Sequence, residues 1–178
     1  MPHRRLAALL ILGPLALAPS ALAHIRLAGE FTMTGRITVD DDVPGEHVGE
    51  RVTRMWDFLA PCPTGQCRTE KLVRSRATGE DRLTLRRKHG EFSHWVGKGS
   101  FYAPLRCGAR IYARGEHVSF TIAVRISGVE IVDGMPVAAS VQASYVNGRR
   151  TNLTPCVAVL GRDAAVYTGK LVSYPVYP

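Results

Sequence analysis

The sequence has 178 residues, of which 46% are hydrophobic and 21% charged, and its formal net charge is +8. This length suits a single domain with one core. The N-terminal apolar run, residues 6–17, is shorter than the roughly 20 residues that a membrane-spanning helix needs, which argues against a membrane anchor.

Residues 1–23 have the pattern of an export signal. Arg4 and Arg5 precede the apolar run, and Ala21-Leu22-Ala23 places small residues where a signal peptidase cleaves. An uncleaved anchor is the alternative. Cleavage leaves residues 24–178, a single secreted β domain of 155 residues, and the loss of two arginines lowers the net charge from +8 to +6. We therefore expect a secreted, extracellular protein.

Apolar and polar residues alternate at period 2 along much of the mature chain, and no helical period appears. The clearest strand is residues 118–126, where alternate apolar side chains face one way. The other alternating segments are 31–39, 52–58, 92–96, 101–105, 137–145, 155–159 and 165–174, with a hairpin between 68 and 88.

Turn signals at residues 97–99, at Asp133-Gly134 and at Asn147-Gly148 separate these segments. The pattern predicts an all-β protein, an antiparallel meander of roughly nine or ten strands. Because the connections are short, we expect the meander to close into a barrel. A two-sheet β-sandwich is the alternative.

Trp56 and Phe58 lie two residues apart, so they share one face of a strand and can anchor a core. Arg54 has the same inward parity, so it either marks a bulge or points into a cavity. The strand ends near Pro61, and the chain reverses before Cys67, because Pro and Gly favour turns.

Four cysteines predict two disulfides in an oxidising compartment. Three pairings are possible, and we favour Cys62–Cys67 with Cys107–Cys156, because the first pair is adjacent in sequence. The second bond closes a loop of about 50 residues and stabilises by about 4 kcal/mol, against about 2 kcal/mol for the first. A zinc site is the alternative, but it lacks the usual close pairs of ligands.

The hairpin of residues 68–88 carries eight Lys or Arg against three acids, a local charge of +5. We predict a turn at 77–79, with Val73, Leu83 and Leu85 inward and the even positions forming a basic outer face. The residues of this face are Arg68, Arg74, Arg76, Arg82, Arg86 and Lys88. Such a face can attract an anionic partner; a solvated face that discourages edge pairing is the alternative.

The Trp-x-Phe-x3-Cys-x4-Cys arrangement of residues 56–67, with the Asn147-Gly148 turn and a Gly-rich terminal hairpin, resembles small secreted domains of actinobacteria that are often drawn as lipocalin-like or avidin-like barrels. The resemblance implies a fold and a compartment, and it carries no catalytic residues. The sequence departs from the lipocalin Gly-x-Trp signature, since Arg54 occupies the Gly position before Trp56.

Catalytic signatures are missing from the sequence, which has no Gly-x-Ser-x-Gly elbow, no Gly-rich phosphate loop and no His-Glu-x-x-His. One alternative function is copper chemistry. Cleavage after Ala23 leaves His24 first, and its amine and imidazole nitrogens suit Cu(II), with His94 or His117 as the second imidazole. A copper carrier or mono-oxygenase is therefore the alternative to a non-enzymatic protein without cofactors.

The sequence thus predicts a binding or structural module. Its expected partner is an anionic cell-envelope polymer or lipid headgroups at the basic hairpin, or a small apolar ligand inside the barrel. The apolar wall for such a ligand is Trp56, Phe58, Phe120 and Ile122, which a closed core requires equally. We expect a monomer, and the sequence carries no specific nucleic-acid signal.

Overall fold

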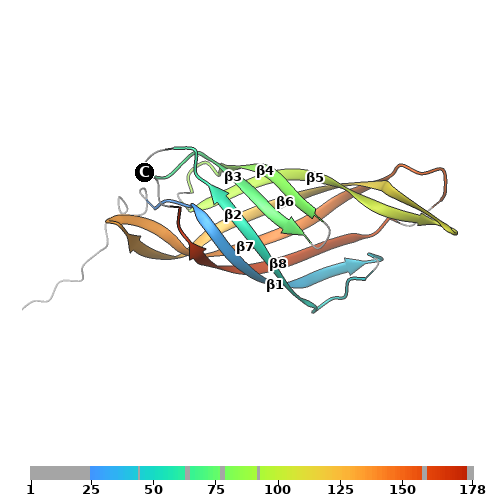
Figure 1. Ribbon diagram of the computed structural model, residues 1–178, viewed down its shortest axis with the longest axis horizontal. Coiled ribbons are helices and arrows are strands. Elements are labelled where there is room, and N and C mark those ends of the chain that lie inside the picture. Colours follow the sequence, from blue (N-terminus) through green and yellow to red (C-terminus); the bar gives the residue numbers. More distant parts are fainter. Residues whose placement is uncertain are drawn as a thin grey trace, which may run out of the picture.

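The computed structural model describes residues 25–43, 45–62, 65–76, 79–91, 93–157 and 160–175. These residues form eight antiparallel strands and no helix (Figure 1). This part of the chain contains no helix with the length and apolar character to cross a membrane. The strands are β1 (Gly29–Asp41), β2 (Arg51–Leu59), β3 (Thr69–Arg76), β4 (Gly79–Arg87), β5 (His94–Cys107), β6 (Arg110–Val132), β7 (Met135–Asn152) and β8 (Arg162–Ser173).

Each strand pairs with the next one in sequence, and β1 pairs with β8 as well as with β2, so the sheet closes into a barrel. The predicted all-β antiparallel meander is confirmed, and the two-sheet alternative is wrong. The predicted signal segment, 1–23, lies outside the described residues.

The predicted number of strands is too high, because two glycine-rich turn signals lie inside strands. Gly97 and Gly99 are inward positions of β5, where a Cβ atom would collide with Leu85 and with the ring of Phe120. They make room for neighbours and do not turn the chain. Asn147-Gly148 is likewise inside β7. Residues 155–157, predicted as part of a strand, belong to a loop.

The Asp133-Gly134 turn is confirmed. It joins β6 to β7, and both residues have positive φ, 49° and 77°, as a two-residue hairpin turn requires. The hairpin between β3 and β4 is also confirmed by the pairing of Arg76 with Gly79, although its turn residues 77 and 78 lie outside the described part of the chain.

The barrel has two different ends. We call the end with the β2–β3, β4–β5 and β6–β7 connections the base; it also holds residues 25–28, which are buried. The backbone of Arg26 bonds Pro136 and Ala138 at 2.9 Å, which fixes these residues beside the β6–β7 hairpin. We call the opposite end, with the other strand connections, the mouth (Figure 1).

The apolar core fills the interior toward the base. Trp56 and Phe58 are fully buried there, as predicted, and pack with each other in an edge-on arrangement. The same cluster contains Phe31, Met33, Leu72, Leu85, Trp95, Phe120, Ile122 and Val124. The four residues expected to form a wall for an apolar ligand are therefore packed as core residues.

One acidic residue is buried in the base half of the barrel. Glu70 has no exposed surface, and neither of its carboxyl oxygens has a hydrogen-bond partner among the described residues. Burial raises the pKa of Glu70 to about 8, although the positive charge of Arg26 opposes this effect. Glu70 is therefore mostly protonated at neutral pH.

Both predicted disulfides are confirmed: Cys62–Cys67 clamps the β2–β3 connection, and Cys107–Cys156 joins the end of β5 to the β7–β8 connection. Two disulfides are typical of extracellular proteins.

Candidate anion-binding surface

The β5–β6 hairpin extends beyond the rest of the barrel at the mouth (Figure 1). Among the described residues, β5 pairs with β4 over Trp95–Gly97 alone, and β7 ends opposite Glu116 of β6. The hairpin beyond these points has no neighbouring strand on either side. We call residues 98–117, with residues 149–157 that lie against them, the finger.

Covalent and hydrogen bonds hold the two segments of the finger together. The Cys107–Cys156 disulfide crosses between them, and the backbone N–H of Leu153 donates to the Gly115 carbonyl at 2.8 Å. Asn152 also holds the loop in place. Its side-chain amide donates to the Cys156 carbonyl at 2.6 Å, and its side-chain oxygen accepts from the backbone N–H of Thr154 at 2.7 Å. The finger is therefore a defined structural unit.

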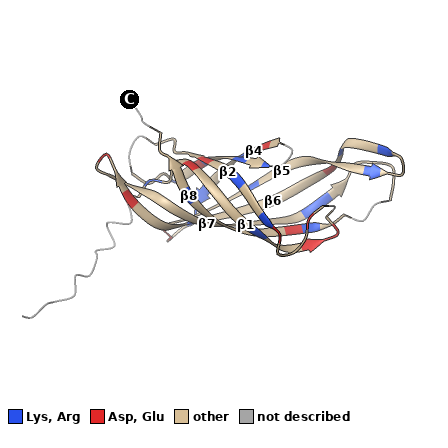
Figure 2. Ribbon diagram, turned by 60° about the horizontal axis from the view of Figure 1, so that its bottom comes forward, with Lys and Arg blue, Asp and Glu red and all other residues tan. Residues whose placement is uncertain are grey.

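The exposed charge of the finger has one sign. Its only acid, Glu116, is 5% exposed and bonds Arg150 at 2.8 Å, so this pair contributes no net charge. The remaining charged residues of the finger are exposed cations, and Figure 2 shows lysine and arginine along this end of the hairpin. They are Lys98, Arg106, Arg110, Arg114 and Arg149.

Aromatic rings position two of these cations. The guanidinium carbon of Arg114 lies 3.8 Å from the centre of the Tyr102 ring, and that of Arg110 lies 4.7 Å from the centre of Tyr112. Tyr102 in turn contacts the ring of His117, with 5.3 Å between centroids. A stacked guanidinium keeps its edge N–H groups available, so it can still bind an anionic oxygen.

Two hollows lie on the outer face of the barrel, and the smaller one borders the finger. The smaller one, of about 540 Å³, is at the root of the finger, between the side chains of Lys98, His117 and Arg149. Serine and threonine line its floor, which suits hydrogen bonding to a polar ligand.

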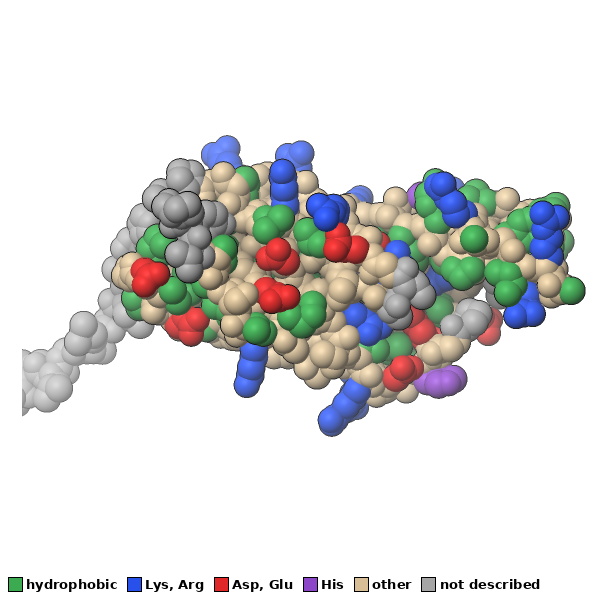
Figure 3. Space-filling view, in the orientation of Figure 1, with side chains coloured by type: hydrophobic (Ala, Val, Ile, Leu, Met, Phe, Trp, Pro, Cys, Tyr) green, Lys and Arg blue, Asp and Glu red, His purple; other side chains and the backbone are tan. Residues whose placement is uncertain are grey.

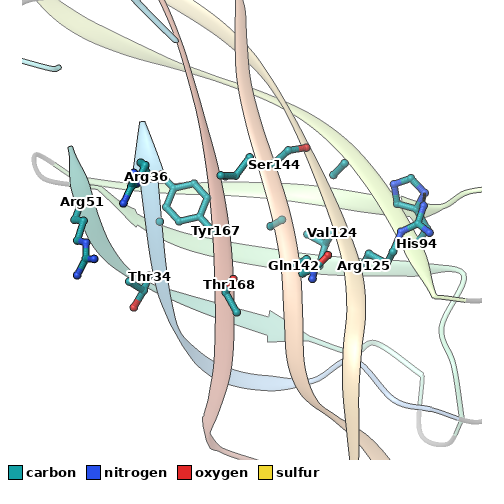
Figure 4. A pocket seen from close by; sticks show the side chains of 14 residues that line it. Thr34, Arg36, Arg51, His94, Val124, Arg125, Gln142, Ser144, Tyr167 and Thr168 are labelled. Carbon is teal, nitrogen blue, oxygen red and sulfur yellow. Dashed lines mark hydrogen bonds between the residues drawn. The ribbon is translucent and has the colours of Figure 1, made fainter. Parts of the chain in front are cut away.

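The larger hollow, of about 730 Å³, lies across β1, β8, β7 and β6 (Figure 4). Arg36 and Arg51 lie at one side of this hollow, and His94 and Arg125 lie at the other. Small polar side chains line the space between them: Thr34, Gln142, Ser144 and Thr168. Cations thus border both hollows.

One acid lies near the larger hollow. Glu91 accepts from His94 at 2.8 Å and from Arg125 at 3.1 Å, and Lys88 contacts it at 2.7 Å. Hydrogen bonds from Lys88 and His94 lower the pKa of Glu91 to about 2, so it is ionised and offsets part of the positive charge on that side.

Charged residues also line the inside of the barrel toward the mouth. Arg74 and Arg76 both bind Asp81, and the Arg74 guanidinium lies 4.5 Å from the centre of the Phe120 ring. A second network joins Arg150 to Glu116 and Asp163, at 2.8 Å and 2.9 Å, and Asn147 donates to the same Asp163 at 2.7 Å. These buried ions have protein partners, so we assign them to structure.

The predicted outward orientation of the six basic residues in the hairpin of residues 68–88 is correct for four of them and wrong for two. Arg68, Arg82, Arg86 and Lys88 are exposed, as predicted. Arg74 and Arg76 point into the barrel. Val73, predicted inward, lies on the outer side of β3.

The reason is the register of β3 and β4. Arg76 pairs with Gly79 and Arg74 with Asp81, so paired residues have opposite parity. Cross-strand partners share a face, and even positions of β3 therefore face the same side as odd positions of β4. The outer surface of this hairpin also carries acids: Arg82 pairs with Glu80 at 2.9 Å.

The copper alternative pairs His24 with either His94 or His117, and it stays a prediction because His24 lies outside the described residues. His117 lies opposite Tyr102, eight residues along β5 from His94, which is about 26 Å of strand. The two histidines are therefore separate alternatives for the second imidazole. Within the described ranges, no group of three or more His, Cys, Asp or Glu is arranged to hold a metal.

The finger was missed because it is assembled from two segments that are far apart in sequence. Arg149 is brought to Lys98 through the pairing of three strands, and the disulfide brings the loop to the hairpin. One sequence signal does point to the finger: no Asp or Glu occurs between Glu91 and Glu116, although four Lys or Arg do.

No family model matches the chain. Comparison with curated proteins and with solved structures gives no match either.

Proposed function

We propose that the protein is an exported binding module that attaches to an anionic component of the cell envelope or its surroundings. The observation that supports this most is the finger, which projects from the barrel with five exposed cations and no exposed acid among its described residues. Export is supported by the signal-like residues 1–23 and by the two disulfides.

Attachment would use contacts between guanidinium or ammonium groups and phosphate, carboxylate or sulfate oxygens. Arginine binds such groups with two parallel hydrogen bonds, which makes Arg106, Arg110 and Arg114 the principal contacts. Lys98 and Arg149, which flank the smaller hollow, would extend the contact toward the barrel. Because all five cations are exposed, ions in solution screen them, and binding should weaken steeply with salt.

The test is retention of the mature protein on an immobilised polyanion, dextran sulfate, across a salt gradient. A finger variant carries Arg106→Gln, Arg110→Gln and Arg114→Gln. We expect the finger variant to elute at much lower salt than the wild-type protein, because three contacts are lost at one site.

A matched control removes three exposed cations from the β3–β4 hairpin: Arg68→Gln, Lys71→Gln and Arg86→Gln. It has the same net charge as the finger variant, so a difference between them reports on position. We expect the control to elute near the wild-type protein. An equal decrease in elution salt for both variants would mean that only total charge matters. A larger decrease for the control would place the binding site on the β3–β4 hairpin instead.

A further inference from the structure

The finger also exposes apolar side chains. Ile111 is 57% exposed, Leu153 52% and Val157 103%, although aliphatic residues of this size are usually buried. In Figure 3 the end of the molecule that carries the finger shows hydrophobic side chains next to Lys and Arg side chains. A partner that offers only anionic groups would leave this apolar surface in water.

The exposed apolar residues come from both segments of the finger. Ile111 lies opposite Arg106 in the hairpin, one position from the turn pair formed by Cys107 and Arg110. Val157 follows the cysteine that is bonded to Cys107. Ile111 and Val157 are therefore near the tip beside Arg106 and Arg110, Leu153 lies next to Gly115, and Arg114, Arg149 and Lys98 lie progressively closer to the barrel.

This mixture of apolar and cationic side chains suits the interface of an anionic bilayer, where phosphates lie next to hydrocarbon. The apolar side chains can enter the interface while the long arginine side chains beside them reach headgroup phosphates. A second copy of the chain fits less well, because two fingers meeting at their tips would bring ten cations together without a counter-charge.

The tip is also ready to insert without rearrangement. The disulfide and the Leu153–Gly115 hydrogen bond fix the loop on the hairpin, so little conformational entropy is lost on binding. Its backbone polar groups need partners in the headgroup region alone, since shallow insertion leaves them at the level of water and phosphate.

We infer that the anionic partner is a lipid surface, an inference that rests on the proposed function. The finger inserts Ile111, Leu153 and Val157 into the lipid interface. Arg106, Arg110 and Arg114 bind headgroup phosphates. The finger thus combines apolar side chains that enter the interface with cations that bind headgroups. Neither alone gives stable attachment, because each contributes only a small part of the binding.

The test is flotation with vesicles of phosphatidylcholine, with and without phosphatidylglycerol. We expect the wild-type protein to float with vesicles that contain phosphatidylglycerol and to stay in solution with phosphatidylcholine alone. A tip variant, Ile111→Ser with Val157→Ser, should bind about tenfold or more weakly, because aliphatic surface no longer enters the interface. Its control, Val129→Ser with Ile131→Ser, removes exposed apolar residues at the base and should bind like the wild-type protein.

Each variant is also run on the dextran sulfate column, which separates the two proposals. The tip variant should keep the salt elution of the wild-type protein while losing vesicle binding. If the wild-type protein binds the polymer but not the vesicles, or if the tip variant floats normally, the lipid inference is overturned and the proposed function stands. Failure on both polymer and vesicles overturns the proposed function itself.

Sedimentation at several protein concentrations tests the remaining occupant. The wild-type protein should stay monomeric. A dimer that disappears in the tip variant would assign the apolar tip to self-association and overturn the lipid inference.

Discussion

Replacing Glu70 by Gln should make the protein more stable at neutral and alkaline pH. Glu70 is completely buried near the base, and its carboxyl group has no hydrogen-bond partner in the described part of the chain. Burial raises its pKa in the folded protein to about 8, from an ordinary value of 4.5. Ionising this group in place therefore requires work, and the glutamine side chain avoids that work.

The sign follows from proton linkage. Between pH 4.5 and 8 the folded protein keeps the Glu70 proton while the unfolded chain has lost it, so the free energy of unfolding falls as pH rises through this window. Below pH 4.5 Glu70 is protonated in both states and does not lower the unfolding free energy. Above pH 8 it is ionised in both states, and the loss of unfolding free energy no longer grows. One pKa unit corresponds to 1.36 kcal/mol, so the total loss is about 5 kcal/mol, with about 3 kcal/mol already lost at pH 7.

The assay is urea unfolding of the wild-type protein and the Glu70→Gln variant at pH 5, 7 and 9. The difference in unfolding free energy should move in favour of the variant by about 4 kcal/mol between pH 5 and pH 9. Glu46, whose pKa burial and the charge of Asp163 raise to about 7, is present in both proteins and cancels in this difference. A difference that stays constant with pH would show that Glu70 is already ionised in the folded state, and the reasoning would be wrong.

Three further predictions concern folding. Replacing Cys107 and Cys156 together by Ser should lower the unfolding free energy by about 4 kcal/mol, measured by urea denaturation, since a loop of about 50 residues is no longer closed; an unchanged midpoint would contradict this. Gly99→Val should lower the unfolding free energy by about 2 kcal/mol, because the valine side chain would overlap the ring of Phe120. A variant that unfolds on heating at the same temperature as the wild-type protein would refute this prediction. Arg150→Met should cost about 3 kcal/mol at pH 7, because two buried carboxylates lose their cation, and a chemical denaturation curve that matches wild type would speak against that role.

Local patterns were sufficient for the fold class. The alternation in residues 118–126 and the placement of Trp56 and Phe58 on the same face of one strand depend on the period of a strand alone. Both are found in the structure. Arg54 also obeys this period: β2 pairs with β1 without a register shift there, so Arg54 is an inward residue and not a bulge.

The orientation of β3 could not be predicted from its own alternation. Leu72 and Val73 are both apolar and adjacent, so either parity puts one of them inside. The short connection to β4 decides the matter, because pairing Arg76 with Gly79 reverses parity between the strands. The inward arginines are tolerated because Asp81 lies across from Arg74 and neutralises it.

The turn predicted at residues 97–99 is wrong because glycine occurs in strands for a reason unrelated to turns. At Gly97 and Gly99 the side chain is missing because large neighbours occupy the space, whereas at Gly134 the backbone needs positive φ. Sequence alone does not separate these two causes. The finger depends on contacts between distant segments, and local alternation contains no information about them.

The incomplete pairing of β5 has a consequence for solubility. Ring closure pairs every strand on both sides over part of its length, but β5 beyond Gly97 has no partner on the side of β4. An unpaired strand of this length is a template for adding strands from other molecules, and Lys, Arg and Pro at its edge oppose such growth. Lys98, Pro104 and Arg106 occupy this segment. The charges assigned here to attachment would therefore also protect the free protein from aggregation, so evolution cannot easily replace them by apolar residues to strengthen lipid binding.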